Sequence, residues 1–310
     1  MSYHILTDSD VVKHTQMKYV IEAIERTLLE KANGTLVSPP RFSLEADEGK
    51  LVFTAGATTG FEKVIGFRVY DTYSNNEVGH EQLVAVFDSQ TGIFKGIVIG
   101  NLLGAIRTGA IGGVAIKWMA RKNSKRLAVI GTGVQARMQL EAAIAVREIQ
   151  YVQVYSRNEQ NRRNFANEMT EKLGIQVIPV DSAMYCVEDA DIIICATNSQ
   201  LPVIEADWLK KGVHINTLGP KSINGSEISV EIAEKSRVIT TDSLEQLKAY
   251  SIPHFLVGTT YENSIIQLSD VVAGKKAGRI SDQDITLYCS VGLSGTEVVV
   301  ANEIMKLAGK

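Results

Sequence analysis

A glycine motif between two hydrophobic runs has the residue types and spacing needed to bind phosphate groups. Gly131-x-Gly133-x-x-Ala136 follows the run 127–130, precedes a segment of helical periodicity and is followed by a second run, 151–155. Gly131 permits a tight turn, Gly133 lets the backbone approach a pyrophosphate, and Ala136 lets the helix pack on the strand. The helix N-terminus adds free N–H groups and a positive dipole end. We therefore predict a strand–turn–helix–strand unit that binds a dinucleotide; a structural turn without a ligand is the alternative.

The residues after the second run bear on which dinucleotide is bound. NAD sites usually place Asp or Glu there, whereas this chain has Ser156 and Arg157. A carboxylate would repel a 2′-phosphate, whereas Ser156 and Arg157 could bind one. NADP(H) is therefore favoured, with NAD(H) as the alternative. As alternatives, Ser156 could cap a helix that begins in 156–159, and Arg157 could be a solvent-exposed surface charge. The predicted coenzyme-binding residues are Gly131, Thr132, Gly133, Val134, Gln135, Ala136, Ser156, Arg157, Thr197 and Asn198.

Hydrophobic periodicity predicts two regions of different architecture. The first has a helix over 7–32, capped by Thr7, then consecutive antiparallel strands and a helix over 107–121. From residue 127 onward strands and helices alternate, which is typical of a parallel sheet with helices on both faces. The strands predicted in the first region are 51–53, 63–73, 82–87 and 94–99.

Composition excludes several classes of protein. The 310 residues carry a net charge of −3 with no basic cluster, which argues against nucleic-acid binding. No hydrophobic run approaches a membrane span, and the N-terminus lacks a signal core. Three cysteines without metal-ligand spacing favour a reducing compartment and predict no metal site. We expect a cytoplasmic protein of two domains.

Six motifs extend over nearly the whole chain: Pro39-Pro40-Arg41, Gly66-Phe67-Arg68-Val69, Gly104-Ala-Ile-Arg107-Thr108, the Gly131 motif, His214-Ile-Asn216 and Ser290-Val-Gly292. With them the chain resembles the ornithine cyclodeaminase/mu-crystallin family, which includes cyclodeaminases, archaeal-type alanine dehydrogenases and ketimine reductases. The resemblance implies an α/β fold in which a Rossmann-type, doubly wound parallel sheet, residues 121–287, is inserted into a β-rich α+β domain. This second domain, 1–120 plus 288–310, would bind substrate and form a homodimer.

The resemblance also implies roles for individual residues. Arg41 and Arg107 match positions that bind a substrate carboxylate, which suits the bidentate guanidinium fork. Thr108, beside Arg107, is expected at the coenzyme. The family usually has lysine where this chain has Arg68; arginine is a poor proton donor, so Arg68 could instead hold a second carboxylate or a carbonyl oxygen. For each arginine the alternative is an ordinary surface cation.

A second departure follows residues 214–218. Cyclodeaminases carry an aspartate after the glycine, whereas this chain reads Gly219-Pro220-Lys221. Lys221 is the nearest replacement, since a lysine near arginines would have a lowered pKa and could donate a proton; a solvated loop lysine is the alternative. Arg68 and Lys221 are thus the catalytic candidates.

These departures argue against ornithine cyclisation. They favour NAD(P)H-dependent hydride transfer to or from a small imino or amino acid, and Arg68 raises the hypothesis of a dicarboxylic imino acid. One alternative is a lyase that releases ammonia with bound NAD. The other is a non-catalytic NADPH- or ligand-binding protein.

Overall fold

A computed structural model describes residues 3–73 and 81–309. The chain forms two compact units, which we call the arginine unit (Met1–Arg107 with Gly292–Lys310) and the coenzyme unit (Thr108–Val291). The predicted domain boundaries lay at 120/121 and 287/288. In the structure the first change falls inside helix α3 (Leu102–Met119), and the second follows strand β17 (Thr286–Cys289), which pairs within the parallel sheet.

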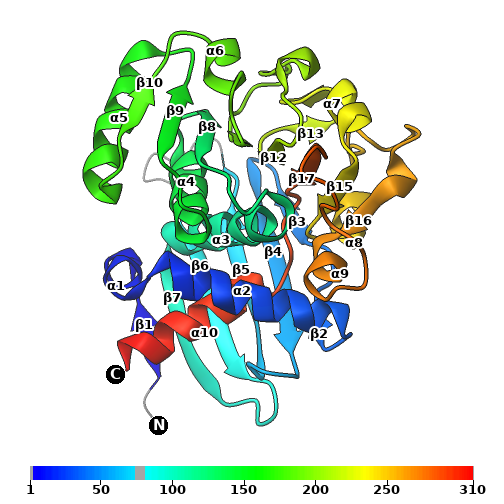
Figure 1. Cartoon of the computed structure of the whole chain (residues 1–310). Coiled ribbons are helices and arrows are strands. Elements are labelled where there is room, and N and C mark those ends of the chain that lie inside the picture. The colour runs from blue at the N-terminus through cyan, green and yellow to red at the C-terminus, as the bar shows by residue number, and fades with distance from the viewer. Residues whose placement is uncertain (1–2, 74–80, 310) are drawn as a thin grey trace. The chain divides into compact units, whose positions relative to one another are not determined.

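The coenzyme unit is built on an eight-stranded, wholly parallel sheet of order β10-β9-β8-β11-β12-β17-β15-β16 (Figure 1). One hydrophobic cluster contains Leu127 and Val129 and another contains Ala128 and Ile130, so successive residues of β8 face opposite sides of the sheet. The predicted α/β, Rossmann-type fold is confirmed. Its strand order reverses between β8 and β11, where such sheets bind their ligands.

The bounds of this unit are as follows: β8 (Arg126–Ile130), α4 (Val134–Val146), β9 (Tyr151–Tyr155), α5 (Glu159–Leu173), β10 (Val177–Pro179), α6 (Ala183–Val187), β11 (Ile192–Cys195), β12 (His214–Thr217), β13 (Lys221–Ser222), β14 (Gly225–Ser226), α7 (Val230–Lys235), β15 (Val238–Thr241), α8 (Leu244–Lys248), β16 (Ile265–Gln267) and α9 (Leu268–Val272).

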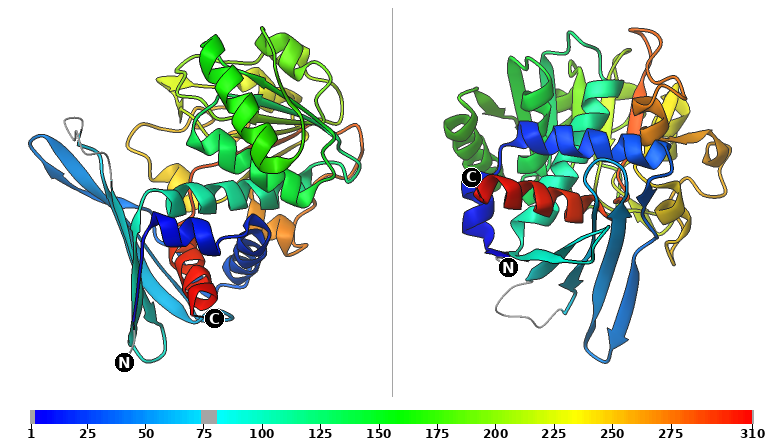
Figure 2. Two further views of the ribbon diagram at one scale, coloured as in Figure 1. Left: turned by 90° about the vertical axis from the view of Figure 1, so that its left-hand side faces the viewer. Right: turned by 90° about the horizontal axis from the view of Figure 1, so that it is seen from below.

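The arginine unit has a seven-stranded sheet of order β1-β7-β6-β5-β4-β2, with β3 paired to β4. Its pairs are antiparallel except for β1 with β7. Helices α10 and α2 lie on one side of this sheet (Figure 2). The elements are β1 (His4–Leu6), α1 (Asp8–His14), α2 (Met17–Ala32), β2 (Leu36–Val37), β3 (Phe42–Ala46), β4 (Gly49–Thr58), β5 (Val64–Asp71), β6 (Gln82–Asp88), β7 (Phe94–Gly100) and α10 (Thr296–Ala308).

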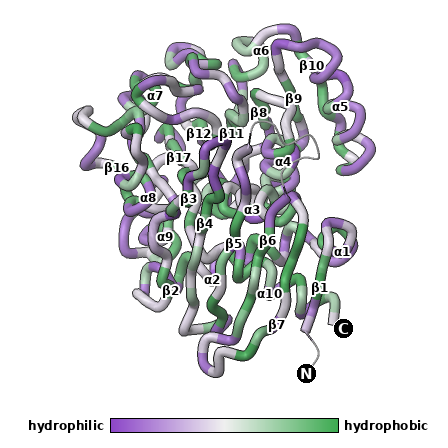
Figure 3. Tube along the Cα trace, turned by 180° about the vertical axis from the view of Figure 1, so that it is seen from behind, coloured by the Kyte–Doolittle hydropathy of each residue, from purple (hydrophilic) through white to green (hydrophobic). Residues whose placement is uncertain are grey.

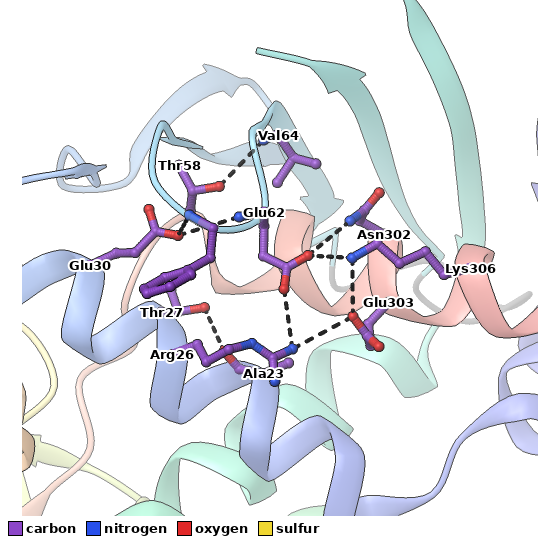
Figure 4. A network of polar contacts seen from close by, with 11 residues as sticks. Ala23, Arg26, Thr27, Glu30, Thr58, Glu62, Val64, Asn302, Glu303 and Lys306 are labelled. Carbon is purple, nitrogen blue, oxygen red and sulfur yellow. Dashed lines mark hydrogen bonds and ion pairs between the residues drawn. The ribbon is translucent and has the colours of Figure 1, made fainter. Parts of the chain in front are cut away.

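Helix α10 is fastened to its surroundings by a polar network around Glu62 (Figure 4). The Glu62 carboxylate accepts from Arg26 at 3.1 Å, Lys306 at 2.5 Å and Asn302 at 3.3 Å. Burial opposes ionisation of Glu62, but Lys306 and Arg26 outweigh it and hold its pKa below the usual value. The network joins the C-terminal half of α10 to α2 and to the loop after β4.

Two predicted elements were wrong in extent. The helix predicted over 7–32 is two helices, because Thr15 and Gln16 have extended backbone angles; the predicted capping contact is present, with Thr7 N–H donating to Asp10 at 2.9 Å. Helix α3 begins at Leu102 and not at 107, so Arg107 lies inside it. The carboxylate of Asp8 accepts from the N–H groups of Asn101 and Leu102, at 2.8 and 3.0 Å, and caps α3 from the start of α1.

Strands β1, β2 and β3 were not predicted, because they are short or lack a buried face. Within residues 3–73 and 81–309, every helix is too short or too polar to cross a bilayer.

Candidate active site

A pocket of about 580 Å³ opens at the carboxyl ends of β8, β9 and β11. Its size and its place at the reversal of strand order are those of a dinucleotide site. Nine of the ten coenzyme residues predicted from the motif and its neighbouring strands line it. Its lining residues are Ile130, Gly131, Thr132, Gly133, Val134, Gln135, Tyr155, Ser156, Arg157, Asn158, Asn161, Ala196, Thr197, Asn198, Ser199 and Val203.

The two glycines of the motif serve different needs. Gly131 has φ +111°, and a Cβ there would lie 2.3 Å from the carbonyl oxygen of Ala196, so a side chain is excluded by the fold itself. Gly133 is the N-cap of α4 with extended backbone angles, and no described atom lies within 4 Å of the place that a Cβ would occupy. The fold itself would therefore allow a side chain at Gly133, and the space beside this residue belongs to the pocket.

Other observations on this loop fit a bound pyrophosphate. The first turn of α4 directs its unpaired N–H groups at the pocket. Arg137 donates to the carbonyl oxygen of Thr132 at 2.5 Å and pairs with Glu168 at 2.6 Å, which holds the loop against α5. The pocket therefore fits a nicotinamide dinucleotide.

Two predicted coenzyme residues do not line this pocket. Ala136 is fully buried in the cluster of Leu127, Val129 and Leu140, where its small side chain lets α4 pack on the sheet. Thr108 lies in α3, and its carbonyl oxygen accepts from Gln139 at 3.0 Å.

The adenosine end of the pocket has polar side chains and no carboxylate among its described lining residues. The helix cap predicted at 156–159 was misplaced: Asn158 is the N-cap of α5 and accepts from the N–H of Asn161 at 2.9 Å. Ser156 lies in the loop before the cap, and its hydroxyl donates to the carbonyl oxygen of Asn158 at 3.0 Å. Arg157 is exposed beside it.

Glu227 is a residue whose importance the sequence did not reveal. Its fully buried carboxylate accepts from the N–H and hydroxyl of Thr197, at 2.8 and 2.9 Å. It also accepts from the hydroxyl of Thr217 and the N–H of Leu218, both at 2.8 Å, and from the N–H of Gly219 at 2.5 Å. One carboxylate thus ties together the loops after β11 and β12, including Thr197 of the pocket wall.

Lys221 follows this anchored loop. It is half-buried, and its Nζ donates to the carbonyl oxygen of Leu218 at 2.8 Å. Burial and the positive charge of Lys221 together lower the pKa of His254 to about 4. Lys221 therefore lies in the coenzyme unit, at the carboxyl end of β12.

His214, the first residue of another motif, has a structural role. It is fully buried and bonded to Thr286 at 2.9 Å and to Asn216 at 2.8 Å. Burial and Arg279 lower its pKa to about 3, so it stays neutral at physiological pH. Asn216 continues the network to Gly112 and Gln139, which anchors α3 to the parallel sheet.

The arginine unit brings Arg68 and Arg107 together on one carboxylate. Glu297, in the first turn of α10, accepts at its Oε1 from Nη2 of Arg107 at 2.9 Å and from Nη1 of Arg68 at 3.2 Å. Burial disfavours the Glu297 anion, but Arg107 and Arg68 prevail and keep its pKa below the usual value. Burial lowers the pKa of Arg68, while Glu297 opposes this shift.

Arg41 joins the same group through Gly292. Gly292 has φ +91°, and a Cβ there would lie 2.8 Å from Nη2 of Arg41 and 3.5 Å from Nη1 of Arg107. Both guanidinium groups therefore lie against the bare backbone of Gly292. The buried Nε of Arg107 has no hydrogen-bond partner within the described part of the chain. We call Arg41, Arg68, Arg107 and Glu297 the arginine cluster.

Comparisons with known proteins identify the family of this chain. The model of the ornithine cyclodeaminase/mu-crystallin family matches residues 1–308. A Delta(1)-pyrroline-2-carboxylate reductase of Bacillus cereus is 33% identical over 98% of this chain and 96% of its own length.

Solved structures give the same result. The Delta(1)-pyrroline-2-carboxylate reductase of Thermococcus litoralis, in complex with NADH and L-proline, is 34% identical with a TM-score of 0.88, over 98% of this chain and 97% of its own. An archaeal alanine dehydrogenase dimer with bound NAD is 29% identical with a TM-score of 0.88, over 99% and 96%. The predicted family is confirmed: this chain belongs to the ornithine cyclodeaminase/mu-crystallin family.

Proposed function

We propose that this protein reduces a small imino acid with one carboxylate, using NAD(P)H, or catalyses the reverse oxidation. The predicted enzyme class, an oxidoreductase acting on C=N or CH–NH₂ groups, is confirmed by the relatives above. The observation that carries the substrate class is the pair of guanidinium groups, from Arg41 and Arg107, that lie against Gly292. Such a pair suits bidentate binding of a single carboxylate.

The residues of the coenzyme pocket have assignable parts. Gly133 and the first turn of α4 would hold the pyrophosphate, and Thr197 and Asn198 would border the nicotinamide. When bound, the coenzyme supplies or accepts the hydride. Lys221 is proposed as the proton donor. Arg68, bound to Glu297 and Gln82, is proposed as a positioning residue.

The test is a panel of cyclic and acyclic imino acids, in which the reaction with each is measured by the change in NADPH or NADH absorbance. We expect steady oxidation of NAD(P)H when a cyclic imine with one carboxylate is supplied. Ammonia release from ornithine without a net change in NAD(P)H would instead assign a cyclodeaminase. Tight coenzyme binding without turnover on any substrate would assign a binding protein.

We propose that the coenzyme is NADPH, because Ser156, Arg157 and the neighbouring asparagines would accept a 2′-phosphate. Replacing Arg157 with alanine is expected to raise the Kd for NADPH about tenfold, as one charge-assisted hydrogen bond contributes about 1.5–3 kcal/mol and an exposed one less. The Kd for NADH should not change. Titration of protein with each coenzyme measures this, and the exposed Arg163→Ala serves as control; an equal loss for both coenzymes would contradict the assignment.

We also propose a homodimer formed through the open face of the antiparallel sheet. Strands β1, β2, β3 and β5 carry exposed hydrophobic residues, and Figure 3 shows hydrophobic stretches along the strands of this sheet. Their exposed fractions are 58% for Ile5, 58% for Val37, 56% for Phe42, 59% for Leu44 and 45% for Ile65. A hydrophobic face of this extent marks an interface, and a second copy of the chain would cover it.

The dimer is tested by placing a charge on this face. Leu44→Lys is expected to yield monomers at micromolar concentration in light scattering, because a lysine ammonium would be buried against hydrophobic residues. Exposed Leu201→Lys, in the coenzyme unit, is the matched control and should not change the mass. Retention of the wild-type mass by Leu44→Lys would move the interface elsewhere.

A further inference from the structure

We propose that Glu297 is a specificity-determining residue, which occupies the place in the arginine cluster that the second carboxylate of a dicarboxylic substrate would take. This inference rests on the proposed function. It assigns a substrate class to the cluster: imino acids with one carboxylate and a neutral side chain.

The first step is the position of the Glu297 carboxylate. Glu297 is fully buried, and the same oxygen, Oε1, accepts from both Arg68 and Arg107. Its other oxygen, Oε2, lies 3.5 Å from the hydroxyl oxygen of Thr296, whose proton is donated to the carbonyl oxygen of Leu293 at 2.6 Å. The carboxylate is therefore held by the two guanidinium groups, and the C-terminal half of α10 is held by the Glu62 network.

The second step concerns the donors of Arg68. Its Nε donates to Gln82 at 2.8 Å and its Nη1 to Glu297, and its guanidinium lies 4.3 Å from the centroid of the Tyr70 ring. A Cβ at Gly104 would lie only 2.9 Å from Nη2, so α3 encloses that side. Each of the two bidentate edges of the Arg68 guanidinium, Nε with Nη2 and Nη1 with Nη2, therefore already has one donor engaged within the protein.

The third step is the charge of the cluster. Three arginines and one glutamate give a net charge of +2, and Glu297 already lies between two of the guanidinium groups. One substrate carboxylate can bind to Arg41 and to the donors of Arg107 that do not contact Glu297. A second carboxylate would have to compete with Glu297 for the same donors, at close range to its negative charge. The hypothesis of a dicarboxylic substrate, suggested by Arg68 alone, is thereby replaced.

The test compares wild type with Glu297→Gln on two imines formed in solution by ammonia with pyruvate or with oxaloacetate. Glutamine keeps the shape, removes one negative charge and loosens the hold on Nη1 of Arg68. The ratio of kcat/KM for the dicarboxylic to the monocarboxylic imine is expected to rise at least tenfold. Glu171→Gln, an exposed residue of α5, is the control and should leave the ratio unchanged.

Loss of activity on both imines by the same factor would show a structural role and overturn the proposal. If none of the imino acids tested causes the wild type to oxidise NAD(P)H, the proposed function fails instead. The two failures are thus distinct. A measurement on wild type alone covers the case in which the variant does not fold. Succinate should inhibit no better than butyrate of similar length; inhibition by succinate more than ten times stronger would also overturn the proposal.

Discussion

Replacing Arg107 with lysine is expected to lower kcat/KM for the imino acid about 100-fold and to leave coenzyme affinity unchanged. Lysine keeps the positive charge that Glu297 requires, at the position where Nη2 of Arg107 now lies 2.9 Å from the carboxylate. Its ammonium is a compact point charge without the planar fork, so it would lose the bidentate contact with a substrate carboxylate while it remains paired with Glu297.

The magnitude follows from the contact that is lost. A hydrogen bond to a charged group contributes about 1.5–3 kcal/mol, and about 1.4 kcal/mol corresponds to a factor of ten in rate. One lost contact therefore predicts a decrease of roughly 10- to 150-fold. Alanine would be a poorer test, because breaking a buried ion pair costs about 3–5 kcal/mol and would mix stability with function.

The control is Arg163→Lys, since Arg163 is exposed and forms an ion pair with Glu159 on its own helix. Initial rates over a range of imino acid concentrations, with saturating coenzyme, measure the effect. Wild-type kcat/KM in Arg107→Lys would mean that Arg107 serves only to neutralise Glu297.

The sequence predicted what depends on local signals. The dinucleotide unit is specified by residues adjacent in the chain: a hydrophobic run, two glycines, a small residue and a helix, and the structure has them as β8, the loop and α4. Alternating hydrophobicity likewise revealed the longer antiparallel strands. Such local patterns suffice because each side chain there interacts mainly with near neighbours or with one face of a sheet.

The features that the sequence did not reveal depend on distant partners. The start of α3 is set by Asp8, which lies more than ninety residues earlier. Glu297 reads as an ordinary acidic residue of a helix's first turn, and only the fold brings it to Arg68 and Arg107. Glu227 reads as a turn residue, although its carboxylate joins two loops of the parallel sheet. A buried carboxylate is thus recognisable only after its donors are placed around it.

Replacing Gly133 with valine is expected to abolish coenzyme binding while preserving the fold, with a Kd at least 100-fold higher. Gly133 has φ −79° and ψ −178°, angles that valine adopts readily. No described atom lies within 4 Å of its Cβ position, so the protein itself has room for the methyl groups. They would occupy the space through which the pyrophosphate approaches the N–H groups of α4.

Gly131→Ala is the matched comparison, because it changes the neighbouring glycine by a smaller side chain with the opposite expected result. Its Cβ would lie 2.3 Å from the carbonyl oxygen of Ala196, and its φ of +111° is strained for alanine. We expect Gly131→Ala to lower the Tm of the coenzyme-free protein by several degrees. Gly133→Val should change that Tm little, since a poorer N-cap costs about 1 kcal/mol or less.

Thermal unfolding with and without coenzyme separates the two effects. Wild type should gain stability as coenzyme concentration exceeds its Kd, by about 2.7 kcal/mol at one hundred times Kd. Gly133→Val should show the wild-type baseline without this gain. A normal gain in Gly133→Val would mean that the pyrophosphate does not pass over Gly133, and the assignment of the loop would have to be abandoned even though the pocket exists.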